Sequence, residues 1–119
     1  MKLCLIGSTK FMELYVKANR DLTLRGHIVY TVATISTKSA LADTESTPIT
    51  TEQKDVLDLV HLRKIQESDA CVLVTDDTGY FGYSTNRELI WAQMNKKPIY
   101  TIHNMDLAGE IVDPKELAL

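Results

Sequence analysis

The 119-residue sequence predicts a single-domain α/β protein, a three-layer sandwich with a mainly parallel sheet of four to five strands. Short apolar runs, typical of strands buried on both faces, alternate with longer segments whose apolar residues recur every three or four positions. Strands that alternate with helices require crossover connections, which favour a parallel sheet covered on both faces. With the second strand outside the first, the strand order is 2-1-3-4, a flavodoxin- or Rossmann-like arrangement.

The first half of the chain contains two predicted strands and one helix. Residues 3–6 are all apolar and end at a glycine, which indicates the first strand. Helical periodicity follows over residues 11–26, with a cation and a glycine at its end. Residues 27–33 are β-branched and aromatic, as in a strand. Residues 34–51 show no clear period and form either a solvated loop or a loop that folds over a ligand.

The second half repeats the alternation. Thr50 and Gln53 have the spacing of a capping box before a helix over residues 51–67. Residues 70–74 form the third strand, and residues 99–103 form the fourth. Between them, Thr85 and Glu88 have capping-box spacing at the start of a helix that Pro98 ends. A short helix is possible over residues 114–117.

Composition excludes several classes of function. The net charge of −3 gives no broad positive field, so a nucleic-acid polymer is not an expected partner. No apolar stretch approaches the roughly 20 residues that span a bilayer, so we expect no membrane association and a cytoplasmic protein. Cys4 and Cys71 lie in apolar runs and are expected in the core, because no CxxC motif supports a redox pair. No His/Cys cluster has ligand spacing, so no metal or organic cofactor is implied.

Polar residues follow the first and third strands, whose carboxyl ends meet at one edge of the predicted sheet, where ligands of such folds bind. After the first strand, Gly7, Ser8, Thr9 and Lys10 offer backbone N–H groups, hydroxyls and a cation, which suit a phosphate. Ser8 or Thr9 is equally explained as a helix N-cap. The segment matches neither a P-loop nor a GxGxxG fingerprint, so nucleotide triphosphate hydrolysis and hydride transfer lose their usual support.

The segment over residues 79–88, GYFGYSTNRE, is the most unusual in the chain. Two glycines and three aromatic residues precede hydroxyls and a carboxylate at a predicted helix start. Glu88 is explained either as a helix cap or as a catalytic carboxylate. Asp76 either binds ribose hydroxyls or solvates the loop, and Tyr80 either stacks on a base or packs the loop.

Three segments together resemble the nucleoside 2-deoxyribosyltransferase superfamily, which also contains nucleoside 5'-monophosphate N-glycosidases. They are the first strand with its Gly7-Ser8 end, residues 61–70 (HLRKIQESDA) and residues 79–89. The resemblance implies that Glu88 attacks or stabilises the anomeric carbon of the sugar, and that the loop after the first strand holds the 5' end. It also implies a homodimer or larger assembly.

Two positions depart from the pattern of that superfamily. His61 stands where the family carries an aspartate that helps the base to leave, and Cys4 stands where several members carry a tyrosine that orients the glutamate. A histidine donates protons near neutral pH, so His61 either serves the same end or is an ordinary helix histidine.

The sequence therefore predicts an enzyme that cleaves, or exchanges a base across, the N-glycosidic bond of a small-molecule nucleoside or nucleotide. The alternative is a non-catalytic nucleotide-binding module with the same pocket. Glu88 and His61 are the predicted catalytic residues. The predicted substrate-binding residues are Gly7, Ser8, Thr9, Lys10, Asp76, Gly79, Tyr80, Gly82, Ser84 and Thr85.

Overall fold

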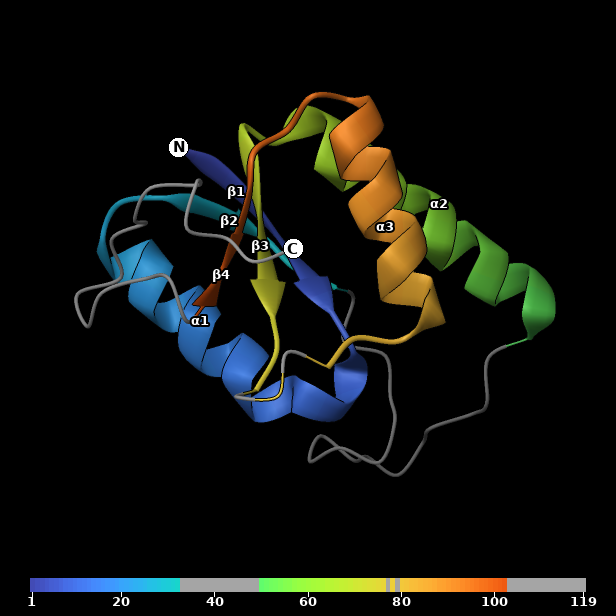
Figure 1. Cartoon of the computed structure of the whole chain (residues 1–119), viewed down its shortest axis with the longest axis horizontal. Helices are drawn as coiled ribbons and strands as arrows, with labels where there is room; N and C mark the ends of the chain where they lie inside the picture. Colours follow the sequence, from blue (N-terminus) through green and yellow to red (C-terminus); the bar gives the residue numbers. More distant parts are fainter. Residues whose placement is uncertain (33–49, 77, 79, 103–119) are drawn as a thin grey trace.

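The computed structural model describes residues 1–32, 50–76, 78 and 80–102 (Figure 1). The strands are β1 (Lys2–Gly7), β2 (Ile28–Tyr30), β3 (Ala70–Val74) and β4 (Ile99–Thr101). The helices are the 3-10 turn η1 (Thr9–Phe11), α1 (Met12–Leu24), α2 (Thr51–Glu67) and α3 (Tyr83–Met94). The four strands form one parallel sheet in the order β2-β1-β3-β4, which confirms the predicted fold class and strand order.

The sheet is covered on both faces, with α1 on one side and α2 and α3 on the other (Figure 1). Alternate side chains of β1 point to opposite layers, so Leu3 and Leu5 pack toward α1 while Cys4 and Ile6 pack toward α2 and α3. Cys4 and Cys71 are free, buried and directly paired in register, and burial raises the pKa of both thiols. Their predicted place in the core is confirmed. Among the described residues, no helix has the length and apolar character needed to cross a membrane.

The element bounds agree with the sequence prediction in most places. The capping box at Thr50 is present, because its side chain accepts a hydrogen bond from the backbone N–H of Gln53 at 3.0 Å while the Gln53 side chain accepts one from Thr50 at 2.8 Å. β2 is shorter than predicted. Most of the irregular segment over residues 34–51 and the possible helix over 114–117 lie outside the described residues.

The predicted capping box of Thr85 and Glu88 is wrong. α3 begins three residues earlier, with Gly82 in an extended conformation as its N-cap and no side-chain cap bond. Thr85 is then in the first turn of the helix, where its side chain is buried. Glu88 lies beyond the reach of the helix start and turns toward α2. Its explanation as a helix cap therefore no longer holds.

Gly7, at the end of β1, is required by two local constraints. Its φ of +150° is one that side chains rarely adopt, and a Cβ there would collide with the carbonyl oxygen of Val74 on β3. The Tyr15 hydroxyl of α1 also donates a hydrogen bond to the Gly7 carbonyl at 2.8 Å. β1 thus ends in close contact with both β3 and α1.

We expect Gly7→Ala to lower the free energy of unfolding by about 3 kcal/mol, because it combines backbone strain with a steric clash. Gly26→Ala is the matched control, since Gly26 also has a positive φ, of +92°, but no atom lies within 4 Å of an added Cβ. Gly26→Ala should lower the free energy of unfolding by only about 1 kcal/mol. Urea denaturation of the two variants measures both values, and equal losses would contradict the clash with Val74.

Candidate active site

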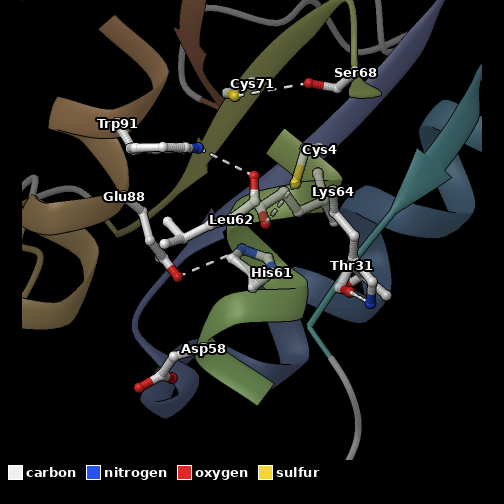
Figure 2. A network of polar contacts seen from close by, with 12 residues as sticks. Cys4, Thr31, Asp58, His61, Leu62, Lys64, Ser68, Cys71, Glu88 and Trp91 are labelled. Carbon is white, nitrogen blue, oxygen red and sulfur yellow. Dashed lines mark hydrogen bonds and ion pairs between the residues drawn. The ribbon is translucent and has the colours of Figure 1, made fainter. Parts of the chain in front are cut away.

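Glu88 and His61, the two predicted catalytic residues, lie against each other between α3 and α2 (Figure 2). The Glu88 Oε2 and His61 Nε2 atoms are 3.5 Å apart, and the two side chains are 19% and 7% exposed. Within the described part of the chain, neither imidazole nitrogen has a hydrogen bond of regular geometry, although the Leu5 backbone is close enough to act on the His61 pKa. Burying a polar ring without such partners costs stability, which is typical of groups kept for function.

Glu88 binds its proton unusually tightly. Burial is the main cause that raises its pKa to about 7, and the negative charge of Asp58 on α2 acts in the same direction. The cations Arg87 and Lys54 partly offset this increase. Lys54 lies 3.2 Å from Asp58 in an i, i+4 ion pair, which reduces the effect of both charges on Glu88. The carboxyl group is therefore about half protonated near neutral pH.

The pKa of His61 is shifted in the opposite direction to that of Glu88. Burial lowers its pKa to about 4, and the ammonium group of Lys64, one turn along α2, contributes to the decrease. The Lys64 ammonium donates a hydrogen bond to the carbonyl of Thr31 at 2.8 Å, which ties α2 to the end of β2. Between about pH 4 and pH 7 the Glu88–His61 pair thus holds one proton.

A second cluster lies at the carboxyl ends of β1 and β3. The Lys10 ammonium lies 4.2 Å from the centroid of the Tyr80 ring and 5.2 Å from that of Phe11, and the two rings meet edge to face at 6.2 Å. The Thr75 hydroxyl, which is buried, donates a hydrogen bond to the Tyr80 carbonyl at 2.6 Å. Two predicted binding residues, Lys10 and Tyr80, are therefore brought together at the carboxyl ends of β1 and β3.

The other predicted binding residues have varied surroundings. Ser8 is the N-cap of η1 and accepts a hydrogen bond from the Lys10 backbone N–H at 3.3 Å, which agrees with its simpler explanation as a cap. Asp76 accepts hydrogen bonds from the hydroxyl and the N–H of Thr78, which lower its pKa. Thr9 and Ser84 are exposed, whereas Gly79 lies outside the described residues. Their binding roles stay predictions.

Three residues near the pair had no signal in the sequence beyond ordinary helix periodicity. Asp58 lies one turn before His61 on α2 and acts on the Glu88 charge. Tyr15 is almost fully buried, and the charge of Glu88 adds to burial in raising its pKa. The Trp91 indole donates a hydrogen bond to the Leu62 carbonyl at 3.2 Å (Figure 2). Among the described residues, no cluster of His, Cys, Asp and Glu is arranged to hold a metal ion.

Comparison with known proteins supports the fold. No protein-family model matches the sequence, and no curated protein matches it. The structure is similar to the 2-deoxyribosyltransferase of Bacillus psychrosaccharolyticus, with a TM-score of 0.60 and 22% identity over 95% of this chain and 77% of that chain. It is also similar to the CMP N-glycosidase BcmB of Clostridium botulinum, with a TM-score of 0.54 and 17% identity over 85% of this chain and 70% of that chain. These likenesses confirm the fold that the resemblance implies.

We expect Glu88→Gln to become more stable relative to the wild type as the pH rises from 4.5 to about 7. In this window the unfolded chain has lost the Glu88 proton while the folded chain retains it, so the wild type loses stability with rising pH. At about 1.4 kcal/mol per pKa unit, the relative gain is on the order of 2 kcal/mol. The lowered pKa of His61 acts oppositely, since it reduces wild-type stability as the pH falls from 6.5 to about 4.

Urea denaturation of both proteins across this range measures the difference. Glu13→Gln, which removes an exposed carboxylate from α1, is the control for the loss of one charge. A difference between Glu88→Gln and wild type that does not change with pH would show that Glu88 is not held in a poorly solvated position.

Proposed function

We propose that the protein cleaves, or exchanges a base across, the N-glycosidic bond of a nucleoside or nucleotide, with Glu88 acting at C1' of the sugar. The buried contact between Glu88 and His61 is the observation that carries the proposal. This contact joins α3 to α2. α3 starts beside the edge of the sheet where β1 and β3 end (Figure 1), which is where α/β sheets of this kind bind ligands. The fold that this chain shares with a 2-deoxyribosyltransferase and a CMP N-glycosidase supports the same chemistry.

The single proton of the pair supplies both groups that the reaction needs. When it moves from the Glu88 carboxyl to Nε2 of His61, it leaves a carboxylate and creates an imidazolium. The carboxylate attacks C1', the C1'–N bond breaks with its electron pair on the base, and the base takes the proton from His61. Water or a second base then attacks C1', releases the Glu88 carboxylate and returns a proton to His61. The pair again holds one proton.

Substrate binding in this proposal uses the loops after β1 and β3. Lys10, with the hydroxyls of Ser8 and Thr9, holds the phosphate or hydroxyl at the 5' end. Asp76, a carboxylate in the loop after β3, binds the sugar hydroxyls, and Tyr80 provides a ring face for the base. Ser84, at the start of α3, offers a further hydroxyl for the phosphate, whereas Gly7, Gly82 and Thr85 shape the end of β1 and the start of α3. The Lys10 cation beside the Tyr80 ring supports a ligand that combines an anion with an aromatic group.

A non-catalytic nucleotide-binding module is the second candidate. The departures at His61 and Cys4 favour it, because the family carries other side chains at both positions. Turnover separates the two candidates, since both would bind the ligand and only an enzyme would consume it.

We expect the purified protein to release free base from a nucleoside or a nucleoside 5'-monophosphate, and Glu88→Ala to lower the rate by about 10³-fold or more while ligand binding persists. Chromatography of ribo- and deoxyribonucleosides and their 5'-monophosphates measures release and identifies the base. Thermal shift measures binding. Binding without release from any substrate would reject the enzyme in favour of the non-catalytic module.

We expect kcat/KM of the wild type to be highest between about pH 4 and pH 7 and to fall above pH 7, because the pair then loses its one proton. His61→Asn should lose about 10²-fold or more in rate and should reverse the high-pH limb, since Glu88 alone then needs only to be ionised. A wild-type rate that rises through pH 7 would contradict the sharing of one proton.

We also propose that two copies of the chain associate through the outer faces of α2 and α3. Six large apolar side chains are exposed on these helices: Val56, Leu59, Val60, Tyr83, Ile90 and Met94. The charges beside them are complementary, because Arg63 and Asp55 flank Leu59 by one turn on either side. An antiparallel two-fold contact centred on Leu59 therefore places Arg63 of each copy opposite Asp55 of the other.

We expect light scattering to show a homodimer, and Ile90→Glu with Met94→Glu to give a folded monomer, because charges on the apolar face oppose its burial. Leu24→Glu on α1 is the control, since Leu24 is 78% exposed and lies on the opposite layer. A wild-type monomer at all concentrations, or a dimer that Leu24→Glu disrupts equally, would contradict this interface.

A further inference from the structure

We propose that Trp91 is a positioning residue for the Glu88–His61 pair: its indole hydrogen bond to the Leu62 carbonyl holds α3 against α2 so that Glu88 stays against His61 and away from water. Its bearing on catalysis rests on the proposed function. The contact itself, and its effect on the pair, require no substrate.

The two cross-helix contacts are neighbours (Figure 2). Trp91 follows Glu88 by three residues on α3, so both side chains leave the helix on the same side. Leu62 is the residue after His61 on α2. The Trp91 contact of 3.2 Å thus lies about one helical turn from the Glu88–His61 contact of 3.5 Å. Any separation of the helices at one contact is transmitted to the other.

Near His61, α2 is held by the Trp91–Leu62 hydrogen bond, the Lys64 hydrogen bond to Thr31 and the buried side chain of Ile65. The first ten residues of α2, 51–60, are all exposed or half-buried, and its fully buried residues are His61 and Ile65. In the part of the chain that the structure describes, the Trp91–Leu62 and Glu88–His61 contacts are the polar side-chain contacts between α2 and α3. The second contact is too long for a good hydrogen bond, so among the described residues the first is the side-chain hydrogen bond that joins the two helices, beside the apolar packing of Ile65 and Leu89.

Losing this hydrogen bond has a consequence that can be measured at Glu88. Because burial is the main cause of the raised pKa of Glu88, water that enters between the helices lowers it toward the ordinary value of 4.5. A Trp91 substitution leaves the charged and titratable residues around Glu88 unchanged. They are Asp58 and Lys54 on α2 and Arg87 on α3, while His61 contacts Glu88 directly. Tyr15 on α1, Cys4 on β1 and Cys71 on β3 are near enough for the Glu88 charge to raise their pKa values.

The test uses Trp91→Phe, which keeps an aromatic ring and removes the N–H donor. Carbon-13 NMR of the glutamate carboxyl groups, with Glu88→Gln to assign the signal, gives the pKa of Glu88 in each protein. We expect a decrease of about one unit or more in Trp91→Phe. The control is Leu22→Val, a core change in α1 on the opposite face of the sheet, which should leave the value unchanged. An unchanged pKa in folded Trp91→Phe overturns the proposal.

A second measurement needs no Trp91 variant. The chain has one tryptophan, so its indole N–H gives a single, assignable NMR signal. If the indole bond and the Glu88 contact are coupled, this signal shifts with a midpoint near pH 7 and stops doing so in Glu88→Gln. An indole signal indifferent to Glu88 ionisation overturns the proposal even where Trp91→Phe fails to fold.

The outcomes also separate this inference from the proposed function. If Trp91→Phe lowers the pKa of Glu88 but no nucleoside or nucleotide releases its base, the positioning role stands and the proposed reaction fails. If base is released, Trp91→Phe should move the high-pH limb of kcat/KM down by the same amount as the pKa of Glu88, because both report the same proton. A high-pH limb that stays in place would overturn the positioning role while the reaction stands.

Discussion

The burial of a carboxyl group beside an imidazole is the constraint on which the candidate site depends. In water an imidazole holds a proton more tightly than a carboxylate. Between α2 and α3 the order is reversed, since desolvation disfavours the charged form of each group and raises the pKa of Glu88 above that of His61. The reversal exists only while the two helices stay packed, so the chemistry of the site depends directly on the packing of this layer.

The position of the sheet determines where the helices α1 and α3 begin. β1 and β3 are the two central strands, and nearly every side chain in them is buried, so their positions leave little freedom. The close approach of Gly7 to Val74 and the Tyr15 hydroxyl bond set the end of β1. From that edge the chain leads into α1 on one face and, after β3, into α3 on the other (Figure 1). The start of α1 and the loop residues that follow β1 are thus positioned by the buried centre of the sheet.

Much of this structure was predictable because it depends on local patterns. Central parallel strands are apolar on both faces, so residues 3–6 and 70–74 are visible as uninterrupted runs. The helix over 51–67 was found to the residue, since the capping box at Thr50 marks its start. The start of α3 was missed because Gly82 caps it through the backbone alone, whereas Thr85 and Glu88 imitate a box. That spacing is coincidental, because Thr85 is a buried residue inside the helix and not its N-cap.

The contacts between helices were not predictable in the same way. The sequence pointed to Glu88 and His61 through a family resemblance, but their contact joins residues 27 positions apart across a strand and two loops (88 − 61 = 27). Trp91 and Asp58 carry no local signature at all, since each fits an ordinary helix pattern. Such residues acquire their importance only from the register in which α2 and α3 pack.

Because Lys10 stacks on Tyr80, movement of the ammonium group and exposure of the aromatic ring are coupled. The Lys10 ammonium group lies over the faces of two aromatic rings, which stabilises it by roughly 0.5–1 kcal/mol. An anion that draws Lys10 away must replace this attraction, and in doing so it uncovers the Tyr80 ring. In the proposed binding mode, recognition of negative charge at one end of a ligand and of a flat ring at the other is therefore cooperative, and a molecule with only one of these features would gain only part of the binding free energy.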